Sequence, residues 1–308
     1  MGNSQAELFG TTTKGFSMNP RMPTQYSLHR ASTGRLASGF DNTDFDKLKG
    51  KTQQVQNVPR RLRDAVVADP GHVLLGADWA GIEWALVMYF AAKIDNPPGF
   101  HLNLLEKFQR GEFDPHCFLA SIAYNTDYDE LVRRHESGEY IKERKLCKPY
   151  THGRNYYGAP RTLAREAGHK DSVGVLVCKA HSRAFRPEPW WEYELDSVKK
   201  LKYVQTPLGW RRYFWDYEPK PTEVFGTKIQ ATAADLMKYV MLNVFETLPV
   251  GFEALTTTHD NLLLQVDEPH AEDGAAWLKR KMEQRIPWLD NRRWRADVKV
   301  GKTWRDVS

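Results

Sequence analysis

The sequence predicts an α+β protein in which a helical block is inserted between strand-bearing segments. A short apolar run ending in an acid, residues 72–78, is followed by apolar residues at helical spacing. The middle of the chain, up to about residue 202, has helical patterns. Alternating patterns return at 203–214 and at 254–266. We therefore expect strands from both parts of the chain to flank the helices.

Composition supports a globular protein and excludes several classes. The 308 residues are 41% hydrophobic and 27% charged, unlike a disordered or fibrous chain. The longest apolar run, Trp84 to Ala92, is far below the ~20 residues of a membrane helix. The first twenty residues lack an apolar signal segment. Cys117, Cys147 and Cys178 fit neither a disulfide framework nor a C-x-x-C site, so we expect a reduced, cytoplasmic protein with no membrane partner.

The first predicted elements are a loop, a strand and a helix. The polar stretch Ser38 to Gln56 is predicted to be a loop. Residues 72–78 form a strand that ends at Asp78, and the helix after it carries apolar residues from Ile82 to Phe90.

Four helices are predicted in the middle block. They cover residues 102–109, 115–123, 130–135 and 143–157. Pro149 lies inside the last of these and would cost roughly 3 kcal/mol unless the helix kinks or begins nearby.

The last predicted elements are a hairpin, a long helix and two strands. Pro207 and Gly209 are predicted to form the turn of the hairpin at 203–214. An amphipathic helix follows, with Gln230 in its first turn and off the apolar stripe. Strands at 254–258 and 262–266 leave Asp260 at a hairpin tip.

Two features of this pattern could carry chemistry. Asp78 and Asp260 each lie at the open end of a short apolar strand, which suits a shared Mg²⁺ site. Taken singly, either residue fits a helix cap or a polar turn equally well. The net charge is +5. The stretch from Lys142 to Lys170 contains eight Lys or Arg residues and only two acidic residues. Such a run is either a solvated helix face or a surface for a polyanion.

Nine short motifs, in this order, resemble those of family A DNA polymerases, the DNA polymerase I group, and the phage members look most similar. They are Ser32-Thr-Gly-Arg-Leu-Ala-Ser38, Gln56-Asn-Val-Pro59, Ala77-Asp-Trp-Ala-Gly-Ile-Glu83, Asp114-Pro-His116, Arg144-x-x-x-Lys148, His152-Gly-x-x-Tyr156, Thr206-Pro-Leu-Gly-Trp-Arg-Arg212, Gln230-Ala-Thr-Ala-Ala-Asp235 and His259-Asp260. The resemblance spans about residues 18–304.

The resemblance implies a right-hand polymerase core that adds deoxynucleotides to a primer 3′ end. Its palm, an antiparallel sheet with helices, would comprise residues 1–93 and 203–308, and its helical fingers residues 94–202. Too few residues precede Thr33 for a thumb or an exonuclease domain, so we expect a split polymerase whose separate polypeptide supplies both. Residues Phe16 to Tyr26 are the expected docking edge. Primer–template DNA and deoxynucleoside triphosphates (dNTPs) are the other implied partners.

The resemblance also implies roles for individual residues. Asp78 and Asp260 would hold two Mg²⁺ ions, and Lys148 would stabilise the charge that develops on the triphosphate. Arg144 and His116 would bind this triphosphate. His152 and Tyr156, four apart and therefore stacked along one helix, would contact the base, and Glu83 would exclude a ribose 2′-hydroxyl. The implied DNA-binding residues, mostly minor-groove donors, are Arg35, Gln56, Asn57, Gln230, Arg211 and His259.

Two residues depart from the family pattern. His152 stands where Phe or Tyr is usual, and Asn261 where Glu is usual. They favour an alternative, a catalytically inactive polymerase-like subunit that binds nucleic acid. A template-directed RNA polymerase is a third possibility. Asp44-Phe-Asp46 resembles a metal motif but lies in a polar loop, and no zinc site is expected.

Overall fold

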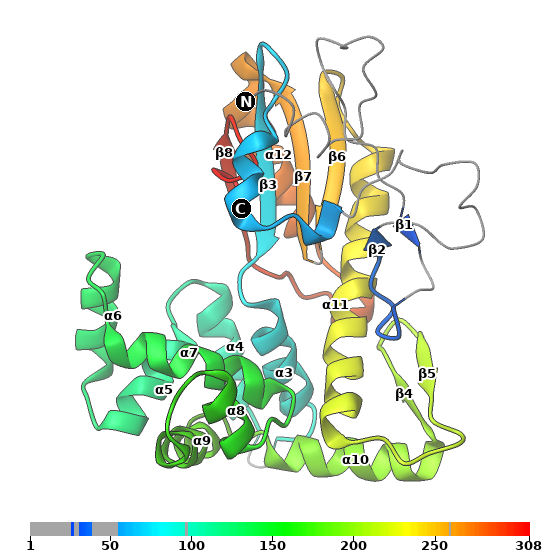
Figure 1. Cartoon of the computed structure of the whole chain (residues 1–308). Coiled ribbons are helices and arrows are strands. Elements are labelled where there is room, and N and C mark those ends of the chain that lie inside the picture. The colour runs from blue at the N-terminus through cyan, green and yellow to red at the C-terminus, as the bar shows by residue number, and fades with distance from the viewer. Residues whose placement is uncertain (1–25, 28–30, 39–54, 96–97, 259) are drawn as a thin grey trace, which may run out of the picture. The chain divides into compact units, whose positions relative to one another are not determined.

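The computed structural model describes residues 26–27, 31–38, 55–95, 98–258 and 260–308. The chain forms two compact units (Figure 1). Unit 1 comprises residues 1–80, 234–286 and 296–308, and unit 2 comprises residues 81–233 and 287–295. These limits differ from those of the predicted palm and fingers, whose assignment stays a prediction.

Unit 1 is built on a four-stranded antiparallel sheet. Its strands, in spatial order, are β6 (Phe252–Thr258), β7 (Asn261–Asp267), β3 (His72–Trp79) and β8 (Ala296–Gly301). The strands predicted at 72–78, 254–258 and 262–266 are thereby confirmed. The pairing register sets Asp78 of β3 opposite Asn261 on one side and Asp297 on the other.

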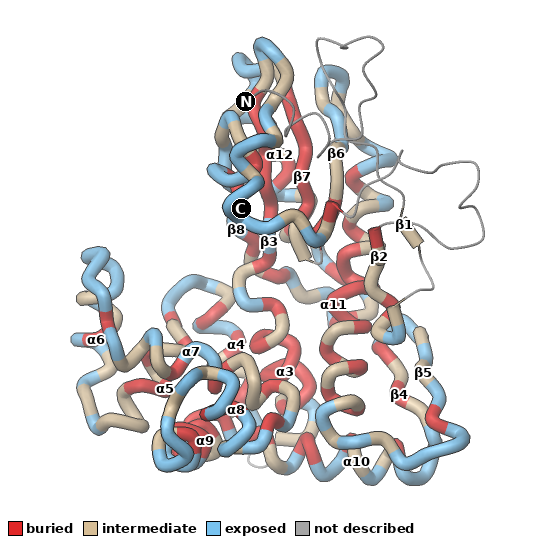
Figure 2. The backbone as a smooth tube through the Cα atoms, in the orientation of Figure 1, coloured by how far each residue is buried: buried red, intermediate tan, exposed pale blue. Residues whose placement is uncertain are grey.

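Both faces of this sheet are covered. Helix α12 (Ala271–Met282) packs on one face, where the Trp79 Nε1–H donates to the Met282 carbonyl at 3.1 Å. On the other face, Leu74 packs with Val55, Leu263, Trp304 and Val307 in one buried cluster. Figure 2 shows the resulting buried residues along β3 and β7.

Gly76 is required on this second face. A Cβ atom at position 76 would lie 2.3 Å from the carbonyl oxygen of Val307, so the C-terminal segment can approach β3 only where there is no side chain.

The remaining elements of unit 1 are short. They are β1 (Tyr26–Ser27), β2 (Ala37–Ser38) and the 3₁₀ helices η2 (Val55–Asn57), η3 (Arg60–Ala65) and η4 (Glu268–His270). The Tyr26 hydroxyl donates to the Thr257 carbonyl at 2.6 Å and so ties β1 to β6. The predicted loop falls mainly on residues 39–54, which lie outside the described residues, as do residues 16–25 of the predicted docking edge.

Unit 2 is mainly helical. Its helices are α3 (Ile82–Ala92), α4 (Phe100–Gln109), α5 (Pro115–Tyr124), α6 (Tyr128–Glu136), α7 (Lys142–Asn155), α8 (Pro160–Glu166), α9 (Asp171–Phe185), α10 (Glu188–Leu201) and the 3₁₀ helix η5 (Pro287–Leu289). All four helices predicted in this block are confirmed, with ends shifted by a few residues. Helix α7 continues through Pro149, which leaves the Lys145 carbonyl without its helical N–H partner.

The predicted hairpin is also confirmed, as β4 (Tyr203–Gln205) and β5 (Arg211–Tyr213). Helix α11 (Pro221–Glu246) begins in unit 2 and ends in unit 1. The prediction that Gln230 lies in its first turn is wrong. The helix already begins at Pro221, so Gln230 lies in the third turn. No described helix is long and apolar enough to cross a membrane.

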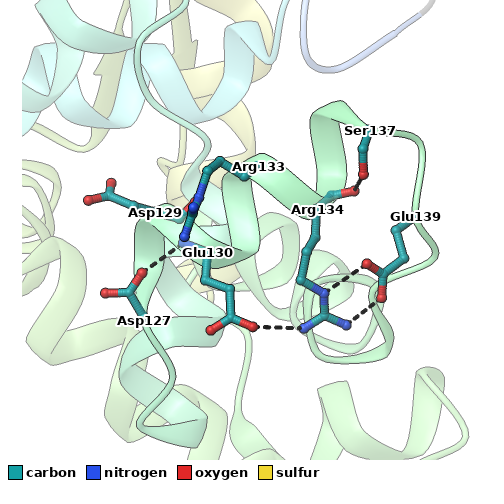
Figure 3. Close-up of polar contacts among 7 residues, drawn as sticks. All are labelled: Asp127, Asp129, Glu130, Arg133, Arg134, Ser137 and Glu139. Atoms are coloured by element: carbon teal, nitrogen blue, oxygen red, sulfur yellow. Dashed lines mark hydrogen bonds and ion pairs between the residues drawn. The ribbon is translucent and has the colours of Figure 1, made fainter.

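Arg134 of helix α6 is paired with acids in and just after the helix (Figure 3). The Asp127 carboxylate caps the helix by accepting from the Glu130 amide at 2.7 Å. Arg134 forms ion pairs with Glu139 at 2.6 Å and with Glu130 at 3.8 Å. The basic residue Arg134 is therefore already balanced by neighbouring acids.

Candidate active site

Asp78 and Asp260 meet at one end of the unit 1 sheet. Asp78 is the penultimate residue of β3, and Asp260 directly precedes β7. Because β3 and β7 pair antiparallel with Asp78 opposite Asn261, the two carboxylates come from neighbouring positions at the same edge. The structure thus brings together the two predicted metal ligands.

The electrostatics of Asp78 report this proximity. Enclosure by protein raises its pKa, and the charges of Asp260 and Asp297 raise it further, to about 7. The Trp79 amide and the Lys299 ammonium act in the opposite direction but do not cancel the effect. The side chain still reaches solvent at the sheet edge. Negative charge therefore exceeds positive charge here, and a bound cation would relieve the excess.

Asp297 was missed by the sequence analysis. It faces Asp78 across the β3–β8 pair and belongs to a strand at the far end of the chain. The alternating pattern of residues 296–301 is the signal that could have drawn attention to it.

The residues present fit a partly protein-bound Mg²⁺. In the described part of the chain, no three His, Cys, Asp or Glu side chains lie close enough to hold a metal by themselves. Mg²⁺ commonly uses one or two carboxylates and completes its octahedron with water and substrate phosphates. Asp78 and Asp260 match that donor set.

In unit 2, helices α5 and α7 bring together three of the predicted triphosphate-binding residues. Arg144 and Lys148 lie one turn apart on α7, and His116 lies in the first turn of α5. The Arg144 guanidinium donates twice to Asp114, at 2.7 and 3.0 Å, so its charge is already balanced. Lys148 is exposed and makes no ion pair with any residue that the structure describes. Of Arg144 and Lys148, Lys148 is therefore the cation more available to a phosphate.

His116 and His152 face each other, with ring centroids 5.4 Å apart. Burial lowers the pKa of His116 to about 3; Asp114 opposes this shift, while His152, Arg144 and Lys148 add to it. Burial also lowers the pKa of His152, where Glu83 of α3 opposes the shift and Lys148 adds to it. Both rings are neutral at pH 7 and can offer hydrogen bonds but no charge.

Tyr156 is the C-cap of α7, directly after the last helical residue Asn155. Its predicted stacking with His152 along this helix stays a prediction. Tyr156 lines a cavity of about 760 Å³, together with Arg154 and Trp191 among others, and His152 is not part of this lining. The Arg154 guanidinium lies 4.5 Å from the centre of the Trp191 ring. A planar, apolar wall with a cation is thus built beside Tyr156.

The predicted DNA-binding residues belong to both units. The Gln56 side chain accepts from the Ser38 amide at 2.8 Å and donates to the Leu36 carbonyl at 3.0 Å, so both of its polar atoms are engaged within unit 1. Within unit 1, Arg35 is half-buried and Asn57 exposed. In unit 2, Gln230 is half-buried and Arg211 exposed. His259 lies outside the described residues, as do Asp44 and Asp46.

Known proteins share this sequence pattern and fold. The sequence model for DNA polymerase family A matches residues 10–306. The thermostable DNA polymerase I of Thermus filiformis is 30% identical over 290 residues, which cover 88% of this chain and 32% of that protein. DNA polymerase I of Chloroflexus aurantiacus is 26% identical over 94% of this chain and 30% of the relative. This chain therefore spans about a third of the length of such relatives.

A solved structure has the same fold. The POL domain of Pol1 from M. smegmatis, in complex with a DNA primer–template and dNTP, superposes with a TM-score of 0.75 at 24% identity. The match covers 94% of this chain and 49% of that one. Together with the family match over nearly the whole sequence, it leads to one conclusion: this chain belongs to DNA polymerase family A.

Proposed function

We propose that this chain is the core of a template-directed DNA polymerase that adds deoxynucleotides to a primer 3′ end. The observation that carries the proposal is the pair Asp78 and Asp260 at one sheet edge, with the pKa of Asp78 raised to about 7 by enclosure and neighbouring carboxylates. A carboxyl group whose pKa is strongly raised by burial and by neighbouring carboxylates is typical of functional sites, and a bound cation would favour its ionised form.

Asp78 and Asp260 would hold two Mg²⁺ ions, which when bound stabilise negative charge on the attacking and departing oxygens of nucleotidyl transfer. The task of the chain is to fix both carboxylates at the sheet edge. The backbone pairing of β3 with β7 supplies this rigidity, because Asp78 is in the last pair of a continuous ladder and Asp260 directly precedes its partner Asn261.

We infer that Lys148 binds the triphosphate directly and stabilises the charge that develops on it. Arg144 would exchange its bonds to Asp114 for bonds to phosphate, so Asp114 holds it in place until a nucleotide arrives. His116 and His152 would donate neutral hydrogen bonds. Glu83, whose charge affects the pKa of His152, would sterically exclude a ribose 2′-hydroxyl.

The cavity beside Tyr156 would accept a base of the templating pair. Its flat wall, formed by Trp191 under the Arg154 guanidinium, suits a nucleobase. Arg35, Asn57 and Gln230 would read the minor-groove acceptors that all base pairs share. The roles of Gln56, Arg211 and His259 in DNA binding, and a separate thumb and exonuclease polypeptide, stay predictions.

The inactive, nucleic-acid-binding alternative rests on one observation. Asn261 lies opposite Asp78 in the sheet, so a carboxylate usual in the family is missing beside the metal ligand. An inactive subunit would bind a primer–template but extend no primer.

Primer extension with Mg²⁺, omitting each dNTP in turn, separates these functions. We expect Asp78→Asn and Asp260→Asn each to lower turnover more than about tenfold, a loss above ~1.4 kcal/mol. Primer–template binding should stay within a few fold. Asp297→Asn is the matched control, because it removes a nearby carboxylate that is not a predicted ligand. Wild-type protein that binds DNA without extending it would support the inactive alternative.

A further inference from the structure

The β4–β5 hairpin of unit 2 has two different faces. Val204, Arg212 and Phe214 point inward: Val204 and Phe214 belong to a buried cluster with Val224 of α11, and Arg212 forms an ion pair with Glu223 of that helix. Because side chains alternate along a strand, the neighbouring residues point outward. The inward face packs the hairpin on α11.

The outward face carries a row of aromatic rings. Tyr203 pairs with Tyr213 across the two strands, with ring centroids 5.4 Å apart. The Tyr213 ring in turn stacks on Trp215 at 4.9 Å, with 14° between the ring planes. Tyr213 is 43% exposed and Trp215 67% exposed. Exposed aromatic rings that gather on one face are typical of binding surfaces.

A cation lies on the same face. The Arg211 guanidinium sits 4.7 Å from the centre of the Tyr203 ring, and its Nε–H donates to the Gln205 side-chain oxygen at 2.7 Å. Arg211 forms no ion pair with a carboxylate in the described residues, and its neighbours are Tyr203, Tyr213 and Gln205. Its positive charge is therefore available to an anion. Asp216 and Glu218 follow at the Trp215 end, so an anionic backbone would run on the Arg211 side.

We propose that this outward face, formed by Tyr203, Arg211, Tyr213 and Trp215, is a stacking site for single-stranded DNA. Unpaired bases offer flat faces to the rings, and the phosphate backbone offers its charge to Arg211. Duplex DNA cannot use the site in this way because its bases are already stacked on each other. The site lies outside the proposed catalytic residues and does not depend on nucleotidyl transfer.

Fluorescence anisotropy of labelled dT20 and dA20 with the full chain tests the proposal. Stacking by one ring is worth enough that Trp215→Ala should weaken binding by about fivefold to a hundredfold, whereas Trp215→Phe should keep most of the affinity. Arg211→Gln should weaken binding and reduce the slope of log affinity against log salt by about one. Binding of a blunt duplex should change less than twofold in Trp215→Ala.

Tyr140→Ala is the matched control. Tyr140 is 68% exposed and has the Lys145 ammonium 5.0 Å from its ring centre, so it has the same chemistry without the row of rings. It should bind both oligonucleotides like wild type. The proposal is overturned if the chain binds no single-stranded DNA, if Trp215→Ala and Tyr213→Ala bind like Tyr140→Ala, or if the single-strand and duplex affinities fall together. The last two results would instead favour a protein partner or a contact to the duplex backbone.

Discussion

The raised pKa of Asp78 makes metal binding depend on pH. With a pKa of about 7, most Asp78 is protonated at pH 6 and ionised at pH 8 in the metal-free chain. A proton and a metal compete for the same oxygens, so apparent metal affinity should fall about tenfold from pH 8 to pH 6. An ordinary aspartate would be ionised throughout this range and would give no change.

Two neighbours of Asp78 predict shifts of opposite sign. Asp297→Asn removes a negative charge that raises this pKa, so the midpoint of the pH dependence should move to lower pH. Lys299→Met removes a positive charge that lowers it, so the midpoint should move to higher pH. Both residues are exposed on β8, and neither is a predicted metal ligand.

Binding of Mn²⁺, followed by the electron paramagnetic resonance signal of the free ion, measures these midpoints without DNA or turnover. Asp78→Asn should remove the pH dependence together with most of the affinity. The reasoning fails if wild-type affinity is equal at pH 6 and pH 8, or if Asp297→Asn and Lys299→Met shift the midpoint in the same direction.

Three further predictions concern packing, capping and sugar choice. Gly76→Ala should lower the melting temperature sharply, because its Cβ would lie 2.3 Å from a backbone oxygen. Gly226→Ala inside α11 has its nearest neighbouring atom at 4.0 Å and should raise the unfolding free energy by about 0.5–1 kcal/mol. Equal effects of the two substitutions would refute the packing argument. Burial opposes ionisation of Asp114, but the hydrogen bonds from Arg144 hold its pKa below the usual value. Asp114→Ala should therefore lower the free energy of unfolding in urea by about 2–3 kcal/mol at pH 7, and by progressively less as the pH falls below about 4. A loss that does not depend on pH would count against the ion pair. Glu83→Ala should raise ribonucleotide over deoxynucleotide incorporation in single-turnover extension; an unchanged ratio would exclude Glu83 from sugar selection and reopen the RNA polymerase possibility.

Local sequence pattern determined much of this protein. Alternating and helical periodicities set the strands of the unit 1 sheet and the helices of unit 2, because each pattern buries one face of its own element. The pattern also marked Asp78 and Asp260, since each lies at the end of a short apolar strand. Periodicity did not locate the start of α11, because it marks the buried face of a helix and not its first residue. Pro221 is the signal for that start, since proline is favoured at the first helical position.

Tertiary structure alone decided which charges are balanced. Asp297 reaches Asp78 only through strand pairing between distant segments, and Asp114 reaches Arg144 only because α5 packs on α7. Pairing and packing of this kind depend on contacts over long sequence separations, which no local window contains. The sequence therefore identified the charged groups, while the fold determined that Asp78 is under-compensated and that Arg144 is already paired.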